Sequence, residues 1–300
     1  MVIVGFIIGT VLGSFVEAVS NRLIKQTSIL GRSYCEKCRK TLAWYDLFPV
    51  VSYLLLKGRC RYCQKKIPRQ ALIVEAGMGL AVALLFALTA PRFEMLVNFN
   101  QQTLLLGLEL FFKLFVVSIL AIVFLVDLRT GYIFDKVTYP AVALSGLFLI
   151  ISTAAKSWFF YQDSLSSSLG KYFLPPYSNY VTDIIQRMWL AVGWSFLSAV
   201  ALALIFVLLI LITRGKGMGW GDVKYVLFLG LALGFPNNLV GIFLAFFLGA
   251  IVSVFLIAFG KKHFGQTIPF GPFLSLGAYL ALLFGPQVLN SYLSSFKLGY

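Results

Sequence analysis

The sequence predicts an all-α, polytopic membrane protein: a bundle of about eight transmembrane helices with a small cytoplasmic loop subdomain. Hydrophobic residues make up 60% of the 300 residues, and charged residues only 12%. A soluble domain usually carries about 25% charged residues, so this chain has too little charge to cover a water-soluble fold of its size. Lipid must therefore be the solvent for most of its surface.

Eight stretches are candidates for crossing the membrane, since a span needs about 20 mostly apolar residues. They lie at 2–21, 70–90, 104–127, 137–154, 188–212, 222–235, 238–260 and 269–290. The sixth stretch is short, and the eighth contains Gly and Pro. The Pro-, Ser- and Tyr-containing stretch 155–187 reads as an external loop. We expect a first span at 1–21, a cytoplasmic subdomain at 22–69 and a membrane core at 70–300.

The distribution of basic residues predicts the orientation. No Lys or Arg precedes the first apolar run, and the basic residues begin at Arg22. That order favours an uncleaved first span with an external N-terminus. With this start, 19 of the 25 Lys and Arg fall in or beside the four loops predicted to be cytoplasmic, 12 of them in 22–69. Basic clusters beside spans usually set topology or touch anionic lipid, so the charge of +14 does not indicate a nucleic-acid partner.

The four cysteines form two C-x-x-C pairs in the first cytoplasmic loop, Cys35 with Cys38 and Cys60 with Cys63. Each pair can present two thiolates to one ion, and two pairs complete a tetrahedral site for zinc. Such a site has no open position for water, so its role would be structural. The alternatives are two disulfides or four free thiols, and disulfides are disfavoured on the reducing side of the membrane.

Carboxylates within membrane spans are costly and are therefore candidates for function. Glu109 has Lys113 four residues later, a spacing that predicts an ion pair on one helix face. Glu17 either reaches the inner surface or faces a polar cavity. Glu75, near the start of the second span, either makes a capping or interfacial pair or supports a site.

Asp127 ends the third span and Asp222 opens the sixth, in Gly219-Trp220-Gly221-Asp222-Val223-Lys224. Each aspartate has a structural explanation: Asp127 could pair with Arg129, and Asp222 could be a helix cap. The predicted topology places both carboxylates at one depth, just below the cytoplasmic surface, and the glycines permit close backbone approach. Two carboxylates within about 3–4 Å share a proton, so one can act as base and the other as acid.

Other nucleophile systems fit the sequence less well. The chain has one histidine, His263, in a basic inner loop, and it has no H-E-x-x-H motif. A Ser-His-Asp site or a His-ligated metal site would have to use His263. The aspartate pair is therefore the favoured chemistry.

These residues together resemble the bacterial type IV prepilin peptidases, which are membrane aspartyl proteases. The resemblance covers most of the chain and rests on six stretches: Gly13-Ser14-Phe15 with Arg22-Leu23, the tetracysteine loop with Asp46-Leu47-Phe48-Pro49, Ile67-Pro68-Arg69 through Val74-Glu75, Asp127, Gly219-Trp220-Gly221-Asp222-Val223-Lys224, and Ile268-Pro269-Phe270-Gly271-Pro272-Phe273. Two positions depart from the family pattern: Glu17 stands where the family commonly has Asn, and Phe134 follows Ile133 where it usually has Pro.

The resemblance implies a specific function. Asp127 and Asp222 would be catalytic, with Gly219, Gly221, Lys224, Glu17 and Glu75 as candidates for supporting the site. The substrates would be prepilin or pseudopilin precursors, whose short basic leader is cut at the inner face of the bacterial plasma membrane. Many family members also N-methylate the new N-terminus with S-adenosylmethionine. A different class stays open: a non-catalytic assembly or transport protein whose zinc-bound loop docks a partner.

Overall fold

A computed structural model of the chain describes residues 1–28, 31–35, 37–89, 101–167, 169–215, 217–260 and 268–297. His263 lies outside them. Apart from two isolated β-bridges, the secondary structure of the described residues is helical, as predicted. The elements are α1 (Val2–Ile24), η1 (Trp44–Leu47), α2 (Val51–Leu55), α3 (Arg69–Thr89), α5 (Gln101–Thr130), α6 (Asp135–Ser166), η2 (Gly170–Phe173), α7 (Tyr180–Ile212), α8 (Trp220–Leu233), α9 (Asn237–Ala258) and α10 (Gly271–Lys297).

Among the described residues, seven helices are long and apolar enough to cross a membrane. The sequence predicted about eight, because the stretch 222–235 was counted as a span. That stretch forms α8, whose 14 residues extend only about 21 Å, less than the roughly 30 Å of a hydrocarbon core. The helix ends at Gly234, where φ is +68°, and Pro236 follows.

Side chains of neighbouring helices form hydrogen bonds with the backbone groups at the end of α8. The side-chain amide of Asn238 donates to the Gly230 carbonyl at 3.2 Å and to the Ser198 hydroxyl at 2.7 Å. The backbone N–H of Phe235 donates to the Ser195 hydroxyl at 3.1 Å. A helix can end at membrane depth only where the protein itself satisfies its backbone groups, and these polar side chains do so for α8.

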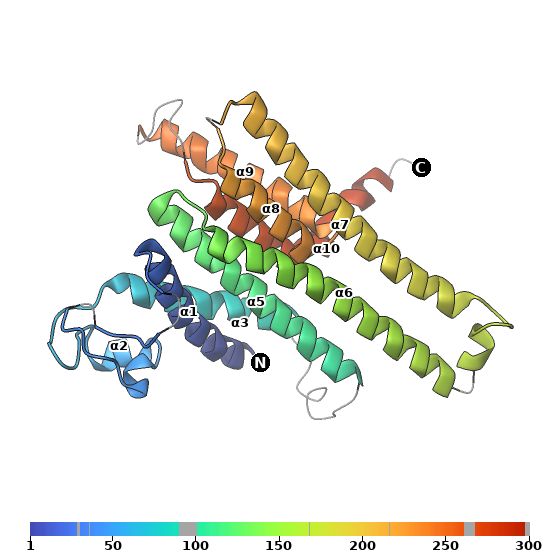
Figure 1. Cartoon of the computed structure of the whole chain (residues 1–300), viewed down its shortest axis with the longest axis horizontal. Helices are drawn as coiled ribbons and strands as arrows, with labels where there is room; N and C mark the ends of the chain where they lie inside the picture. The colour runs from blue at the N-terminus through green and yellow to red at the C-terminus, as the bar shows by residue number, and fades with distance from the viewer. Residues whose placement is uncertain are drawn as a thin grey trace.

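The helices pack as neighbouring pairs around α5 (Figure 1). The pairs are α1 with α3, α7 with α8, and α9 with α10, and α5 contacts both α1 and α10. The segment between α1 and α3 and the starts of α6 and α10 gather at the left-hand end of Figure 1. The loop between α1 and α3 and the helices that follow two other predicted cytoplasmic connections thus begin at one end of the molecule.

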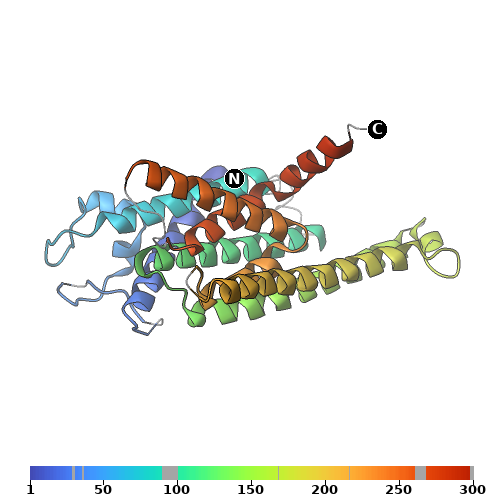
Figure 2. The ribbon, with the colours of Figure 1, turned by 90° about the horizontal axis from the view of Figure 1, so that it is seen from above.

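The α6–α7 hairpin extends past the other helices at the opposite end (Figure 2). Its helices contain 32 and 33 residues, or almost 50 Å each. The expectation of a loop over 155–187 was therefore wrong for most of its length, since α6 continues to Ser166 and α7 begins at Tyr180. The Pro175–Pro176 stretch lies in the short connection between them.

Small residues bring α1 and α3 into close contact. Gly5, Gly9 and Gly13 repeat every four residues, and a Cβ on any of them would lie within 3.0 Å of an atom of α3. This is the packing of small-xxx-small helix pairs in membranes. Gly13 consequently lies against the backbone of Glu75.

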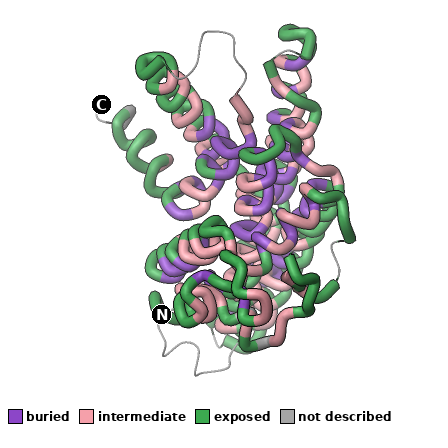
Figure 3. Tube along the Cα trace, turned by 90° about the vertical axis from the view of Figure 1, so that its left-hand side faces the viewer, coloured by how far each residue is buried: buried purple, intermediate pink, exposed green. Residues whose placement is uncertain are grey.

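Burial follows the contacts between helices (Figure 3). The buried core is drawn from all the long helices and includes fully buried aromatic residues such as Phe206 and Phe228. The outward faces of the same helices carry many exposed Leu, Ile, Val and Phe side chains. Lipid would cover such faces in a membrane protein.

Candidate active site

A cavity of about 570 Å³ opens at the end of the molecule where α5, α6, α8 and α10 meet. Both predicted aspartates line it, together with the predicted Gly219, Gly221 and Lys224. Three segments far apart in the sequence supply its wall: the end of α5 with the connection to α6, the start of α8 with the stretch before it, and the stretch that leads into α10. The lining residues are Asp127, Gly131, Tyr132, Ile133, Asp135, Gly215, Gly217, Met218, Gly219, Trp220, Gly221, Asp222, Lys224, Ile268, Pro269 and Phe270.

Asp127 lies in the last turn of α5 and is only 4% exposed. Its Oδ2 accepts a hydrogen bond from the backbone N–H of Gly271 at 2.9 Å. Gly271 is the first residue of α10, so an orphan N–H at a helix N-terminus points at this carboxylate, a favourable arrangement for a negative charge. The suggested partner of Asp127, Arg129, binds Glu17 instead.

Asp222 is the third residue of α8 and is 9% exposed. Its Oδ2 accepts a hydrogen bond from the backbone N–H of Gly219 at 3.0 Å, which closes a capping arrangement at the start of the helix. The side chain is therefore a cap from the third helical position rather than from the N-cap itself. Asp222 and Asp127 both line the cavity, so the two carboxylates face one common space.

Gly221 allows the α5–α6 connection to approach α8. A Cβ on Gly221 would lie 3.0 Å from the Cβ of Ile133. By contrast, Gly219 has an ordinary extended backbone, and a Cβ there would meet no atom closer than 3.7 Å. Close approach of the α5–α6 connection is therefore the reason for the glycine at 221. Residue 219 contributes only its backbone N–H, which holds the Asp222 side chain.

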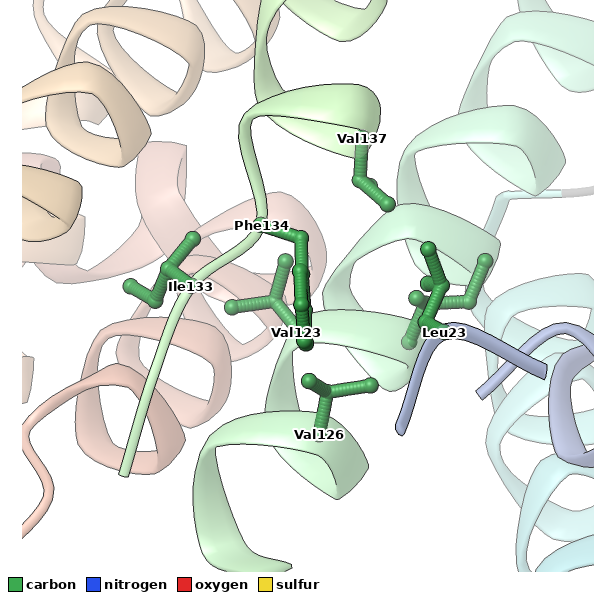
Figure 4. Close-up of a pocket in the computed structure, with 7 residues that line it drawn as sticks. Leu23, Val123, Val126, Ile133, Phe134 and Val137 are labelled. Atoms are coloured by element: carbon green, nitrogen blue, oxygen red, sulfur yellow. The ribbon is translucent and has the colours of Figure 1, made fainter. Parts of the chain in front are cut away.

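Phe134 anchors the connection from the other side. It lines a small apolar void of about 10 Å³ between α1, α5 and α6. In Figure 4, Phe134 projects toward Val123 and Val126 of α5, and Leu23 approaches from α1. Phe134 also makes an edge-to-face contact with Tyr132, with 5.2 Å between ring centroids. Phe134 stands where the resembled family usually has Pro, so an aromatic side chain that packs on the core takes the place of a rigid residue.

Lys224 of α8 forms an ion pair with the start of α6, the helix that follows the Asp127 segment. Its Nζ lies 2.7 Å from Oδ1 of Asp135 and 4.9 Å from the ring centre of Tyr139. Asp135, the first residue of α6, was not singled out from the sequence. Its position eight residues after Asp127, at the start of the next helix, was the available signal. The ion pair fixes α6 to α8 at the rim of the cavity.

A buried hydrogen-bond network connects α8 to α10. The Tyr225 and Ser275 hydroxyls are 2.7 Å apart, and the Ser275 hydroxyl donates to the Gly271 carbonyl at 2.9 Å. Tyr225 lies one turn after Asp222, and Ser275 one turn after Gly271. The network therefore links the helix of one aspartate to the residue that binds the other, and no sequence pattern had indicated it.

Glu17 and Glu75 lie elsewhere: among the described residues, neither lines this cavity. Glu17 is buried in α1 and forms an ion pair with Arg129 at 3.1 Å. Arg129 also donates to the side-chain oxygen of Asn21 at 2.8 Å, and Asn21 donates to Glu17 at 3.1 Å. Glu17 therefore attaches α1 to the end of α5, two residues beyond Asp127.

Glu75 fixes the tetracysteine loop to α3. Its Oε2 accepts a hydrogen bond from the backbone N–H of Val50 at 2.7 Å. Glu109 pairs with Lys156 of α6 at 2.6 Å rather than with Lys113 on its own helix, the partner that the spacing suggested. In both cases a neighbouring element supplied a partner that sequence separation could not reveal.

The four cysteines come together as the two C-x-x-C pairs predict. Their sulfur atoms all lie within 4.8 Å of one another, and those of Cys35 and Cys63 are 3.9 Å apart. Tetrahedral zinc with Zn–S bonds of about 2.3 Å requires S···S separations of about 3.8 Å, so the donor set fits a metal ion. The thiols form no disulfide. The backbone N–H of Cys38 stabilises the Cys35 thiolate and lowers the pKa of Cys35 to about 7.

Asp46 organises the same loop. Its carboxylate binds Arg61 at 2.7 Å and accepts from the Tyr62 hydroxyl and the Ala43 backbone N–H, both at 3.3 Å. Arg61 and Tyr62 lie between Cys60 and Cys63, so Asp46 holds the second cysteine pair against the segment that follows the first.

Replacing Gly271 by Ala is expected to lower the activity of the site by about a hundredfold. The added Cβ would lie 2.6 Å from Oδ2 of Asp127, and a displacement of about 1 Å at a reacting group can cost that much. Gly107→Ala is the matched control, because a Cβ there meets nothing within 4 Å. The two variants are compared by kcat/KM for peptide cleavage, and equal values would contradict this role for Gly271.

The Lys224–Asp135 pair is expected to affect activity without affecting stability. Both side chains are partly exposed, and such pairs contribute at most about 1 kcal/mol to folding. Lys224→Gln and Asp135→Asn should each lower kcat/KM by about tenfold and leave the Tm unchanged. The exchanged pair, Lys224→Asp with Asp135→Lys, should recover part of the loss. Failure of the exchange to recover any activity would show that the pair does not act by positioning.

Two family models match the chain. "Bacterial Peptidase A24 N-terminal domain" matches residues 7–89, and "Type IV leader peptidase family" matches residues 114–254. The first range holds α1, the tetracysteine loop and α3, and the second holds both Asp127 and Asp222. No solved structure gives a significant match.

Relatives from several bacteria carry the name "Prepilin leader peptidase/N-methyltransferase". The Bacillus subtilis (strain 168) protein is 27% identical over 289 residues, which cover 96% of each chain. The Aeromonas salmonicida (strain A449) protein is 27% identical over 89% of this chain and 76% of its own length. The Burkholderia pseudomallei (strain K96243) protein is 24% identical over 93% and 84%, respectively.

The similarity to the relatives therefore spans nearly the whole chain. The described residues contain seven helices that can cross a membrane, four cysteines placed for a metal ion and two buried aspartates on one cavity. This chain is a multi-pass membrane protein that belongs to the type IV leader peptidase family.

Proposed function

We propose that this protein is a membrane aspartyl endopeptidase that removes the short basic leader from type IV prepilin or pseudopilin precursors. The observation that carries the proposal is the placement of Asp127 and Asp222. They come from helices almost 100 residues apart in sequence, yet both are buried and both line one 570 Å³ cavity. The family and the names of the relatives support the substrate class.

The two carboxylates would divide the chemistry between them. Like charges in a buried site resist simultaneous ionisation, so the pair would hold one proton. The ionised aspartate takes a proton from water as the water oxygen attacks the scissile carbonyl carbon, while the protonated one donates to the carbonyl oxygen. Collapse of the tetrahedral intermediate breaks the C–N bond, and the leaving amine takes up a proton from the pair.

The surrounding residues support this division. Gly271 and Gly219 each donate a backbone N–H to one Oδ2, at 2.9 Å and 3.0 Å. These bonds prevent rotation of the carboxylates, so their orientation would not depend on the substrate. The apolar lining from Met218, Trp220 and Phe270 would accept the hydrophobic side of the cleavage site.

The charges suit a basic leader. The cavity is lined by three aspartates and one lysine. The carboxylates of Glu17, Asp46 and Glu75 are occupied by Arg129, Arg61 and Val50. The acidic cavity is therefore our candidate for attracting the leader despite the basic loop beside it. We place the protein in the bacterial plasma membrane with the N-terminus outside and the cavity on the cytoplasmic side, as the distribution of Lys and Arg favours.

Two cofactors accompany the proposal. Structural zinc on Cys35, Cys38, Cys60 and Cys63 would hold the loop together, since a four-thiolate site leaves no position for substrate. S-adenosylmethionine would supply a methyl group for N-methylation of the released amine, the second activity in the relatives' name. Its sulfonium cation is of a kind that aromatic faces and carboxylates attract. The exposed Tyr132 and Trp220 beside Asp135 at the cavity are residues that could hold it.

The test is cleavage of a prepilin-like peptide by the purified protein in detergent, with mass spectrometry of the products. A new N-terminus at the end of the basic leader is expected, and added S-adenosylmethionine should raise the mass of that product by one methyl group. An intact peptide under all conditions would overturn the peptidase and favour the alternative, a non-catalytic assembly or transport protein whose metal-bound loop docks a partner. Cleavage without methylation would remove only the second activity.

A further inference from the structure

We infer that the tetracysteine loop docks on the membrane surface beside α3, through a patch that binds anionic phospholipid. The patch has an apolar part and a basic part. Its apolar members are the exposed residues Phe48, Val51, Leu54 and Leu55, and its basic members are the exposed residues Lys57, Arg59, Lys65 and Lys66. This inference adds a lipid-binding surface to the proposed function.

The depth of α2 is the first observation. The Val50 backbone N–H, immediately before α2, donates to Glu75 at 2.7 Å. Glu75 lies six residues into α3 from Arg69, or about 9 Å along the helix axis. The 21 described residues of α3 extend about 31 Å, and its first residue, the exposed Arg69, is a cation that belongs near the surface of a bilayer of about 30 Å. Glu75 then lies below the surface. In Figure 1, α2 accordingly lies beside the beginning of α3.

The exposure of α2 is the second observation. None of its residues is buried; Leu54 is 62% exposed and Leu55 is 78% exposed. Large apolar side chains exposed together on a small polar subdomain usually mark a contact surface. At the depth set by Glu75, these side chains reach the boundary between headgroups and acyl chains. Surface-bound helices bury their apolar face about 5–10 Å into that boundary.

The charge beside α2 is the third observation. Lys57 lies two residues after the end of α2, and an isolated β-bridge between Arg59 and Lys66 brings Lys65 and Lys66 back beside Arg59. Among the described residues of 25–68, Asp46 is the acidic one, and Arg61 and Tyr62 already bind it. The basic members of the patch therefore face no described carboxylate of the loop, and anionic headgroups are their matching partner.

The backbone at Val50 shows that α2 is held in place. Val50 has φ +61° and ψ −51°, and the Val51 N–H donates to the Pro49 carbonyl. This is a γ-turn with positive φ, which is strained for a β-branched residue. The bond from Val50 to Glu75 fixes the turn, so α2 has a defined position against α3 rather than a free one.

The test is hydrogen–deuterium exchange of the backbone amides of 48–58, with the full protein in nanodiscs. One set of discs contains phosphatidylcholine alone, and the other contains an equal mixture with phosphatidylglycerol. We expect slower exchange in the anionic discs. Lys65→Gln with Lys66→Gln should reduce the difference between the two lipids. Each lysine removed should raise the exchange rate in the anionic discs by up to about fivefold. Leu55→Ser should increase exchange in both lipids.

Matched controls are Leu169→Ser and Lys171→Gln, exposed residues of the α6–α7 connection. The metal content of each variant reports whether the loop is still folded, and a Leu55 variant that loses metal is replaced by Leu55→Ala. Equal exchange in the two lipids would overturn the inference. Protection that rises with protein concentration would also overturn it, in favour of a second copy. Both faces of a nanodisc have the same lipids and cleavage is not measured, so the outcome is independent of the proposed orientation and activity.

Discussion

Asp127→Asn and Asp222→Asn are each expected to lower kcat/KM for cleavage of a prepilin-like peptide by about a thousandfold. Asparagine preserves the shape of the side chain and can still accept the N–H of Gly271 or Gly219. It cannot take up or give the shared proton, and loss of acid–base catalysis typically costs 10² to 10⁴ in rate. The fold should persist, because the side-chain volume and the capping bonds are retained.

The measurement is the initial rate of appearance of the new N-terminus, with the Tm of each variant taken in the same detergent. Asp183→Asn, an exposed aspartate in the first turn of α7, controls for the loss of one negative charge and should cleave at the normal rate. Full activity in either dyad variant would refute the proposed mechanism. A large fall in Tm would mean that the aspartate is needed for folding. The variants Asp127→Glu and Asp222→Glu would then separate the effect of side-chain position from that of ionisation.

Cys60→Ser is expected to remove the metal from the loop. Cys60 is the buried member of the cluster, and a structural zinc ion commonly contributes about 10–16 kcal/mol to the folding of a small domain. Elemental analysis should find about one zinc per wild-type chain and almost none in the variant. Limited proteolysis should then cut within 25–68, while the membrane helices stay intact.

Lys37→Ser is the control for the metal experiment, because Lys37 is exposed and lies between two of the cysteines without offering a thiolate. It should keep its zinc. Zinc near zero in the wild-type protein purified without chelator would remove the metal assignment. Equal zinc in wild type and Cys60→Ser would show that the ion binds elsewhere.

Much of the candidate site could be predicted from local sequence. The two C-x-x-C pairs are close in space because each knuckle is short and the intervening segment is only about 20 residues. Asp222 is held by Gly219 three residues earlier, which is a local capping interaction. Lys224 followed from the same motif, although its partner Asp135 did not.

The partners that sequence reasoning missed are contacts between helices. The bonds of Asp127 to Gly271, Glu17 to Arg129 and Glu75 to Val50 each join residues that are far apart along the chain. The suggested local partners, Arg129 for Asp127 and Lys113 for Glu109, were plausible by spacing and were displaced by such contacts. Side-chain rotamers and helix packing decide among several cations of similar sequence distance, and spacing contains no information about either.

The sequence by itself determined the solvent and most of the helices: its composition requires lipid, and its long apolar runs predicted helices that the structure contains. The two cysteine pairs predicted the cluster of four thiols. Only the tertiary structure decided which residues surround the aspartates and how many helices cross. The stretch 222–235 is as apolar as a span, yet Gly234 and Pro236 end it. Asn238 and Ser195 satisfy its backbone from other helices, and Ser198 holds the Asn238 side chain. A helix can stop inside a membrane only when neighbours complete its hydrogen bonds, and those neighbours exist only in the folded chain.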